Sequence, residues 1–329
     1  MKTQMNGIVK FIAVLLVTAG VGLAETTASA AVPSGTISNR APYAQAPAEK
    51  QGLPGTINYV EGQAMLNGEP LSTSAAGYTV AQPGQTIQTQ AGYVEVLLTP
   101  GAFLRIGHNS EVVMQSLGLT NVQMQVAHGS AMVEVADLVK GSRMQVGIDG
   151  ATTQIEKRGL YAFDADRQLV RVFDGKAKVL ASDNAKSIGK GDQILLSESN
   201  LKSHGFDKQV AEADPLYVWS KARSETEAQA NVAVANYINV YGGWYGPGWY
   251  WAPFWGSYAF LPAYGFAYSP FGWGFYSPGF VYAAPLRYGF YGHGYYHGHV
   301  PGVHASVRGY AGGFHGGFAG GFHGAGGHR

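Results

Sequence analysis

Hydrophobic and polar residues alternate with a period of two over most of residues 53–200, in short runs separated by turns that contain glycine. In one such run, Met124 and Val126 fall on one face and Gln125 falls on the other. An Asp-Gly pair at 174–175 separates two further runs and is the strongest hairpin-turn sequence in the chain. Because such alternation is typical of half-buried strands, we predict that residues 53–200 form an all-β domain of stacked strands with a core of its own.

The pattern becomes helical in residues 206–236. Asp214 is a suitable N-cap, Pro215 fits the first turn, and no further proline or glycine occurs before Gly242. Small and apolar residues recur at helical spacing, namely Trp219, Ala222, Thr226, Ala230 and Ala233. We predict a helix over residues 206–236 that packs this stripe against the β-domain or links the domain to the C-terminal segment.

Oppositely charged residues four apart flank this stripe, in the pairs Lys221 with Glu225 and Arg223 with Glu227. Such pairs on a helix surface contribute only about 0.2–0.5 kcal/mol each, so the apolar stripe has to provide the docking. Trp219 is the largest residue in the stripe. We expect it to be a packing anchor rather than a ligand contact.

The C-terminal residues 237–329 are rich in glycine, aromatic residues and histidine and contain no Lys, Asp or Glu. Pro253, Pro262, Pro270 and Pro278 recur every eight or nine residues, a spacing that excludes long central strands. Because ordering each residue costs about 1–2 kcal/mol of backbone entropy, we predict a low-complexity tail that is largely disordered when alone. Its dense aromatic rings suit self-association or glycan binding, and a passive spacer is the alternative.

Four histidines of this tail form a candidate metal site. His293, His297, His299 and His304 lie two to five residues apart on a glycine-rich stretch, a spacing that allows neutral imidazoles to bind Zn, Cu or Ni weakly. No carboxylate side chain lies in residues 237–329 to orient them. Opportunistic chelation without biological use is therefore the favoured interpretation, and a metal site is the alternative.

The first 30 residues have the pattern of a secretory signal peptide. Two lysines precede an apolar run over residues 11–24, and small residues supply cleavage points before Glu25 or, as we expect, before Ala31. The run is short for a retained membrane anchor, which needs about 20 apolar residues. We expect cleavage, export to the bacterial periplasm or beyond it, and no integral membrane span in the mature chain, which begins with a Pro- and Ala-rich linker over residues 31–52.

Composition narrows the function classes further. The chain has 329 residues, no cysteine, 13% charged residues and a formal net charge of +1. Without cysteine, a disulfide framework, thiol catalysis and iron–sulfur clusters are excluded. Because neither half of the chain has a dense basic patch, nucleic acid is not an expected partner.

Several stretches of the β-region occur in an order known from one protein family. They are GTINYVEGQAMLNGEPL, AQPGQTIQTQAGYVEVLLTPGAFLRIGHNSEVVM, AHGSAMVEV, TTQIEKRGLYAFDAD and VRVFDGKAKVLASDNAKSIGKGDQILL. An opening Gly-x-Val-like strand, a Pro-Gly-Gln step, a turn ending in Asn-Ser and a closing Gly-Lys-Gly-Asp-Gln resemble the FecR-type extracytoplasmic domain. The resemblance covers residues 53–197.

The resemblance implies a stacked all-β unit. In the best-known family members, this unit passes an iron-uptake signal from an outer-membrane receptor to a cytoplasmic sigma factor. Only ten residues precede the apolar run of this chain. We therefore expect the external module to carry over without direct control of a sigma factor.

Catalytic signatures for a nucleophilic serine, a zinc protease or a phosphate-binding loop do not occur in the sequence. Asp164 and Asp166 begin like a calcium loop, but the later positions of that motif are not matched. Glu95, Glu134, Asp164 and Asp166 could meet in space as paired carboxylates, although charged residues on strands are usually solvated. We expect no enzyme and no cofactor.

These observations favour an exported, non-catalytic FecR-like binding module of the bacterial cell envelope that recognises a protein or an envelope component, with a role in signal sensing. The alternative is a structural or adhesive envelope protein whose aromatic, glycine-rich tail associates with itself or binds glycan. A third hypothesis, metal buffering, depends on the histidine-rich end.

Overall fold

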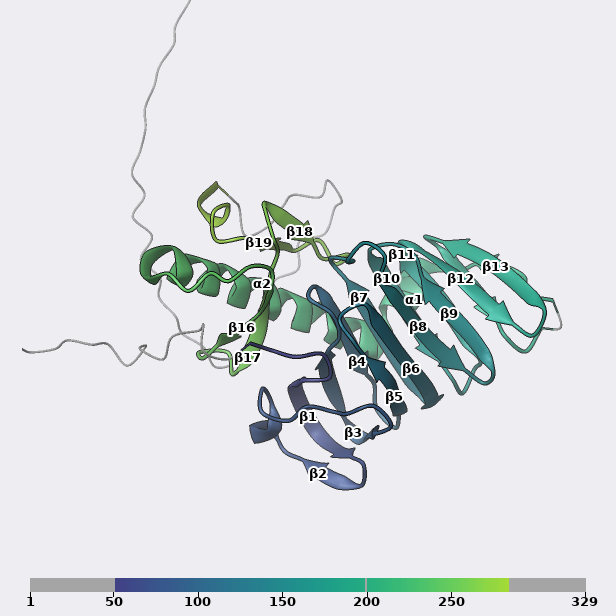
Figure 1. Cartoon of the computed structure of the whole chain (residues 1–329). Coiled ribbons are helices and arrows are strands. Elements are labelled where there is room, and N and C mark those ends of the chain that lie inside the picture. The colour runs from purple at the N-terminus through teal and green to yellow at the C-terminus, as the bar shows by residue number, and fades with distance from the viewer. Residues whose placement is uncertain (1–50, 199, 284–329) are drawn as a thin grey trace, which may run out of the picture. The chain divides into compact units, whose positions relative to one another are not determined.

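The computed structural model describes residues 51–198 and 200–283, which all belong to the compact unit Ala46–Arg329. The predicted fold class is confirmed, because strands dominate the described residues and a long helix follows them (Figure 1). The strands of the large sheet are β1 (Ile57–Leu66), β2 (Glu69–Leu71), β3 (Thr86–Leu97), β4 (Ala102–Ile106), β5 (Glu111–Leu117), β6 (Asn121–His128), β7 (Ser130–Val135), β8 (Arg143–Ile148), β9 (Ala151–Ile155), β10 (Gly159–Asp164), β11 (Leu169–Asp174), β12 (Lys176–Ala181), β13 (Asn184–Gly189), β14 (Asp192–Leu195) and β15 (His204–Gly205).

The remaining elements follow in chain order. They are the helices α1 (Lys208–Glu212) and α2 (Pro215–Tyr241), the strands β16 (Gly248–Ala252), β17 (Ser257–Leu261), β18 (Phe266–Tyr268) and β19 (Gly274–Tyr276), and short 3-10 turns at Thr73–Ala75 and Val281–Ala283.

The large sheet has two branches that meet at β3. One runs through β4, β7, β10, β11, β14 and β15, and the other through β5, β6, β8, β9, β12 and β13. Val133 of the first branch and Met124 and Val146 of the second belong to one buried hydrophobic cluster. The two branches therefore share a core, as expected of stacked strands. All recorded strand pairs in this sheet are antiparallel except β6 with β8.

The Asp-Gly pair at 174–175 does not form the predicted hairpin. It joins β11 to β12, but β11 pairs with β10 and β14, whereas β12 pairs with β9 and β13. Gly175 has φ +95°, and a Cβ there would lie 2.2 Å from the Tyr161 hydroxyl. The glycine therefore turns the chain from one branch of the sheet to the other, which a local turn motif does not distinguish from a hairpin.

The range 206–236 predicted as one helix contains α1 and most of α2, and α2 has the predicted cap at Asp214 but ends later than predicted. The Asp214 carboxylate accepts a hydrogen bond from the Leu216 backbone N–H at 2.8 Å. The helix continues past residue 236 to Tyr241, where Gly242 provides the C-cap with φ 80°. The helix therefore ends at Gly242, the first glycine after Asp214, and not at the end of the small-residue stripe.

The buried face of α2 matches the predicted stripe only in part, because Ala230 is fully buried but other stripe positions are not. Ala222 is exposed, whereas Ser220, Arg223, Glu227 and Asn231 are buried. The predicted pair of Arg223 with Glu227 forms, but it is sealed inside the protein instead of lying on the helix surface. Polar and charged residues occupy the middle of this face, between apolar residues at both ends, because their partners on the sheet are also polar and charged.

Trp219 packs against the sheet as an anchor. Its ring stacks on Tyr93 with centroids 4.7 Å apart, and its indole N–H donates to the Glu61 carboxylate at 2.9 Å. This agrees with the packing role predicted for it.

Residues 237–283 have regular structure, contrary to the tail that we predicted for them. They complete α2 and form the hairpins β16–β17 and β18–β19, whose strands are only three to five residues long. Trp249, Phe260 and Phe275 are buried in one cluster with Phe103 of β4. Burial of these rings stabilises the ordered form of the segment, which an isolated glycine-rich backbone lacks.

Candidate functional site

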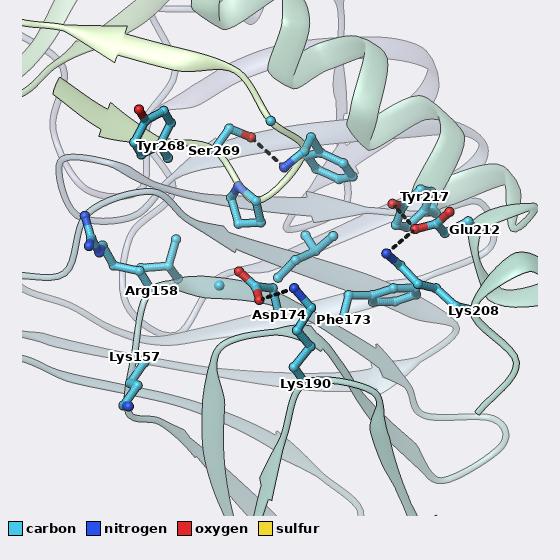
Figure 2. A pocket seen from close by; sticks show the side chains of 16 residues that line it. Lys157, Arg158, Phe173, Asp174, Lys190, Lys208, Glu212, Tyr217, Tyr268 and Ser269 are labelled. Atoms are coloured by element: carbon cyan, nitrogen blue, oxygen red, sulfur yellow. Dashed lines mark hydrogen bonds and ion pairs between the residues drawn. The ribbon is translucent and has the colours of Figure 1, made fainter. Parts of the chain in front are cut away.

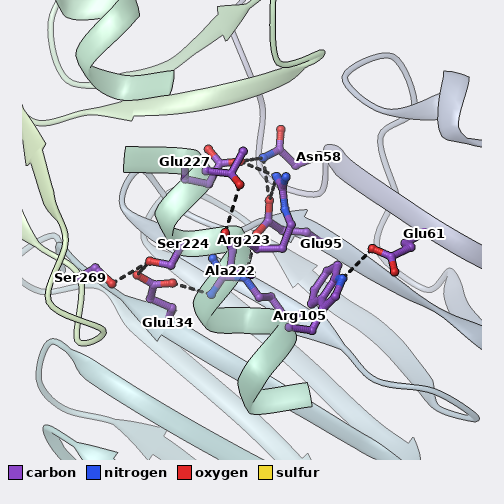
Figure 3. A network of polar contacts seen from close by, with 12 residues as sticks. Asn58, Glu61, Glu95, Arg105, Glu134, Ala222, Arg223, Ser224, Glu227 and Ser269 are labelled. Atoms are coloured by element: carbon purple, nitrogen blue, oxygen red, sulfur yellow. Dashed lines mark hydrogen bonds and ion pairs between the residues drawn. The ribbon is translucent and has the colours of Figure 1, made fainter. Parts of the chain in front are cut away.

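Five charged side chains are buried between the sheet and α2. We call them the buried charge cluster: Glu95, Arg105, Glu134, Arg223 and Glu227 (Figure 3). Arg223 is 6% exposed and the other four are 0% exposed. Charged side chains are almost never buried so completely unless they are paired. The stability of the cluster therefore depends on its ion pairs and hydrogen bonds.

Strand register places the three members on the sheet together. Glu95 of β3 lies opposite Arg105 of β4, and the Arg105 Nε donates to Glu95 Oε2 at 2.8 Å. Glu134 of β7 lies two residues beyond Met132, which is opposite Arg105. The Arg105 Nη1 donates to Glu134 Oε2, so one guanidinium joins both carboxylates.

Two residues of α2, one turn apart, complete the cluster. The Arg223 Nη2 donates to Glu95 Oε1 at 2.9 Å and to Glu227 Oε1 at 2.6 Å. The same guanidinium lies 4.1 Å from the centroid of the Tyr59 ring. Charge-assisted contacts of this kind hold α2 on the sheet more specifically than an apolar stripe would.

Polar side chains extend the cluster to the aromatic hairpins. Asn58 Nδ2 donates to Glu95 at 2.9 Å and to Glu227 at 3.1 Å, and its Oδ1 accepts from the Tyr258 backbone N–H at 2.7 Å. Ser224 Oγ donates to Glu134 Oε1 at 2.9 Å.

Asn231 of α2 holds the second hairpin to the first. Its Nδ2 donates to the carbonyls of Phe260 at 2.7 Å and Tyr276 at 2.9 Å, and its Oδ1 accepts from the Tyr276 backbone N–H at 2.8 Å. The hairpins are therefore bound to α2 through hydrogen bonds between the Asn231 side chain and their backbone, and through buried rings.

Burial and neighbouring charges shift the pKa values of Glu95 and Glu227 in opposite directions, which favours a proton on Glu227. Burial raises the pKa of Glu95, but Arg223 and Arg105 outweigh that effect and lower the pKa to about 2. Burial and the neighbouring charge of Glu95 raise the pKa of Glu227 well above its usual range. With Glu227 protonated, two arginines face two carboxylates and the buried charge is balanced.

Two of the four carboxylates considered as a catalytic set do meet, and two do not. Glu95 and Glu134 share Arg105, so our expectation that they are solvated is wrong. Asp164 accepts from the Arg167 backbone N–H, and Asp166 contacts the Gly129 backbone N–H and His128.

The sequence does carry a signal for this burial. Glu95, Arg105 and Glu134 each interrupt a run that is otherwise apolar on both faces, namely YVEVLL, AFLRI and AMVEV. Strands of that composition are covered on both sides, so a lone charge within them is buried and needs a partner.

The histidines in the described part of the chain are His108, His128 and His204, and His204 of β15 lies 3.2 Å from the Glu198 carboxylate. His108 packs on the Tyr93 ring with centroids 4.0 Å apart, and His128 Nδ1 lies 2.6 Å from the Asp166 carboxylate. Within residues 51–198 and 200–283, no group of three or more His, Asp or Glu side chains is placed to hold a metal ion. The candidate metal site His293, His297, His299 and His304 lies outside the described residues.

An open cavity of about 610 Å³ lies at the edge of the buried region, where the sheet, α1, the start of α2 and the β18–β19 loop meet (Figure 2). Its lining includes four cationic and two anionic residues, Lys157, Arg158, Lys190, Lys208, Asp174 and Glu212. The rest of the lining is largely apolar or aromatic, with Phe173, Tyr217 and Phe271 among its rings. In contrast to the buried charge cluster, this site is accessible to a ligand.

Comparison with known proteins gives a partial structural similarity. No protein-family model and no curated protein sequence matches the chain. Two crystal structures, each of a candidate anti-sigma factor from Parabacteroides distasonis, match with 17% and 18% identity and TM-scores of 0.34 and 0.33. Each match covers 39% of this chain and 62% or 63% of the other. Similarity at this level leaves the function to be argued from the site itself.

Neither α1 nor α2, the helices in the described residues, combines the length and the hydrophobicity that a membrane crossing requires.

Proposed function

We propose that this protein is an exported, non-catalytic, FecR-like binding module of the bacterial envelope, which recognises a protein or an envelope component through the open cavity. The observation that carries the proposal is the accessibility of that cavity, where exposed cationic side chains lie around largely buried aromatic rings. Concave sites with an apolar lining and a few polar groups are the usual ligand sites of proteins. A role in sensing an envelope signal is part of the proposal and depends on the order of the FecR-like motifs.

The absence of catalysis is proposed from the state of the charged groups. Glu95 and Glu134 are fully buried and each contacts an arginine, so neither can reach a substrate or exchange a proton with it. A general acid or base has to lie within hydrogen-bond distance of the reacting group. The buried charge cluster therefore acts as a structural connection between the sheet, α2 and the hairpins.

A second candidate function is glycan binding at the aromatic hairpins. A separate cavity of about 430 Å³ is lined by Trp244, Tyr264, Phe280 and Asn239, together with other uncharged residues and without Lys, Arg, Asp or Glu. Tyr264 is 91% exposed. Aromatic rings beside an amide suit a neutral sugar, which favours the adhesive alternative at this place.

Two substitutions separate the two candidates. Pro270→Trp narrows the large cavity, and Ala263→Trp narrows the aromatic one. The full chain and both variants are immobilised and exposed to an envelope fraction, and the captured components are identified by mass spectrometry. Loss of a specific component with Pro270→Trp alone supports the proposal, whereas loss with Ala263→Trp alone supports glycan binding. Equal capture by all three chains contradicts both.

Export is tested by fractionating cells that express the full chain and determining the N-terminus of the recovered protein. We expect a chain in the periplasm or the medium that begins at Ala31. An uncleaved chain in the cytoplasm would refute export.

A further inference from the structure

The cations that line the large cavity are not all neutralised within the protein. Lys190 lies 3.2 Å from the Asp174 carboxylate and Lys208 lies 3.3 Å from Glu212, so these two lysines are paired (Figure 2). Within the described residues, the exposed side chains of the adjacent Lys157 and Arg158 form no ion pair. With four cations and two carboxylates, the lining carries a net positive charge.

The ion pairs of Lys190 and Lys208 are exposed and therefore weak. The side chains of Lys190 and Lys208 are 65% and 62% exposed. Exposed ion pairs contribute about 0–1 kcal/mol, so a bound anion can draw these lysines toward itself at small cost. Cations from three separate segments, the β9–β10 loop, the β13–β14 turn and α1, are thus available around one opening.

The apolar part of the cavity is aromatic. Phe173 and Tyr217 have ring centroids 4.9 Å apart, and Tyr217 and Phe271 have centroids 5.3 Å apart in an edge-to-face arrangement. The Tyr217 hydroxyl donates to the Glu212 carboxylate at 2.9 Å, which fixes the central ring. A preformed aromatic wall adds affinity for an apolar or planar group and none for a small inorganic ion.

From this combination we infer that the cavity binds an amphiphilic anion, in which an oxyanion group is carried on an apolar or aromatic body. The inference rests on the proposed binding function and adds the chemistry of the ligand. The guanidinium of Arg158 suits a two-point contact with a carboxylate, a phosphate or a sulfonate, while the body of the ligand lies against the aromatic wall. The cavity volume of about 610 Å³ lies within the range of about 300–1,000 Å³ usual for small-molecule sites.

Two dyes of similar aromatic shape test the inference on the full chain. Anilinonaphthalenesulfonate carries a sulfonate, and N-phenylnaphthylamine has no charge. We expect the anionic dye to bind more tightly than the neutral one, to be displaced by a fatty or aromatic carboxylate or phosphate, and to bind more weakly as the salt concentration rises.

Charge variants locate the site. Lys157→Gln combined with Arg158→Gln should weaken binding of the anionic dye about tenfold, which corresponds to about 1.4 kcal/mol, and leave the neutral dye unchanged. Phe271→Ala should weaken both dyes. Lys186→Gln is the matched control, because Lys186 is an exposed cation on β13 that does not line the cavity. Melting temperatures of all variants show whether the fold is kept.

The outcomes separate this inference from the proposed function. Equal affinity for the two dyes, or no effect of the double charge variant on the anionic dye, overturns the anion inference. If capture of an envelope component still depends on Pro270 in that case, the binding function stands with a different ligand chemistry. Loss of both results overturns the function and the inference together.

Discussion

Replacing Arg105 with methionine tests whether the buried charge cluster holds the protein together. The guanidinium is fully buried and contacts Glu95 at 2.8 Å as well as Glu134. Without it, Glu134 keeps the Ser224 hydroxyl, and Glu95 keeps Arg223 and Asn58. Removing one partner of a buried ion pair costs about 3–5 kcal/mol, because the charge left behind has lost its compensation.

The assays are urea unfolding, which gives the free energy of unfolding, and thermal unfolding of the full chain, both followed by circular dichroism and tryptophan fluorescence. For a body of this size, a loss of 3–5 kcal/mol corresponds to a decrease of about 6–20 °C in melting temperature. Lys176→Met is the control, since it breaks an ion pair with Glu156 at 3.4 Å in which the lysine side chain is 47% exposed. That change should cost no more than about 1 kcal/mol.

A compensating variant makes the test specific to charge. Adding Glu95→Gln and Glu134→Gln to Arg105→Met removes the uncompensated charges and should recover part of the lost stability. If Arg105→Met costs as little as Lys176→Met, or if the two glutamines recover nothing, the assignment of the cluster as a structural connection is refuted.

Further predictions concern the proton, the helix contacts and the boundary of the folded body. Because the pKa of Glu227 is raised above the usual 4.5, the folded state retains a proton that the unfolded state releases, so stability falls as the pH rises above 4.5. Glu227→Gln should reduce the difference in unfolding free energy between pH 5 and pH 8, measured by urea titration. An unchanged difference would contradict the raised pKa of Glu227. The lowered pKa of Glu95 acts in the opposite direction, and stability should fall as the pH decreases from 4.5 toward 2, as acid titration of wild type beside Glu95→Gln will show. Asn231→Ala removes three buried hydrogen bonds and should cost about 2–4 kcal/mol with faster amide exchange in β17 and β19, whereas the exposed Asn184→Ala should have no effect. A chain truncated after Ala283 should unfold cooperatively like wild type, while truncation after Asn236 should lower the melting temperature and cause aggregation, because it removes the rings that cover Phe103 and exposes Phe103 to solvent. Equal melting of the two truncated chains would show that the hairpins do not belong to the body.

The strands and the start of α2 could be predicted from local patterns. Period-two alternation in residues such as Met124 and Val126 depends only on one face being buried, and both residues are fully buried. The cap at Asp214 is likewise local, since its carboxylate bonds the backbone two residues on.

The site could not be predicted in the same way because it depends on contacts between distant segments. Asn58 reaches Glu227 across 169 residues, and Ser224 reaches Glu134 across 90. The helix face was assigned wrongly because Arg223 and Glu227 fit an exposed pair at i,i+4 as well as a buried one. Only the apolar residues around Glu95 indicate that this pair is buried rather than exposed.

The aromatic segment shows the same limit from composition. Gly and Pro in residues 237–283 predict short, irregular structure, and the strands are indeed short. Composition does not show that α2 and β4 provide a surface on which Trp249 and Phe275 are buried. Disorder was predicted for this stretch as an isolated segment, and its neighbours supply the missing core.

Photo-crosslinking in living cells tests the central claim, recognition through the open cavity, most directly. A benzophenone amino acid replaces Tyr268, which lines that cavity, or Tyr264, which lines the aromatic cavity instead. We predict that illumination joins the Tyr268 variant to a discrete envelope component and that the Tyr264 variant gives no such adduct. Adducts from Tyr264 alone, or only crosslinks between copies of this chain, would contradict the claim.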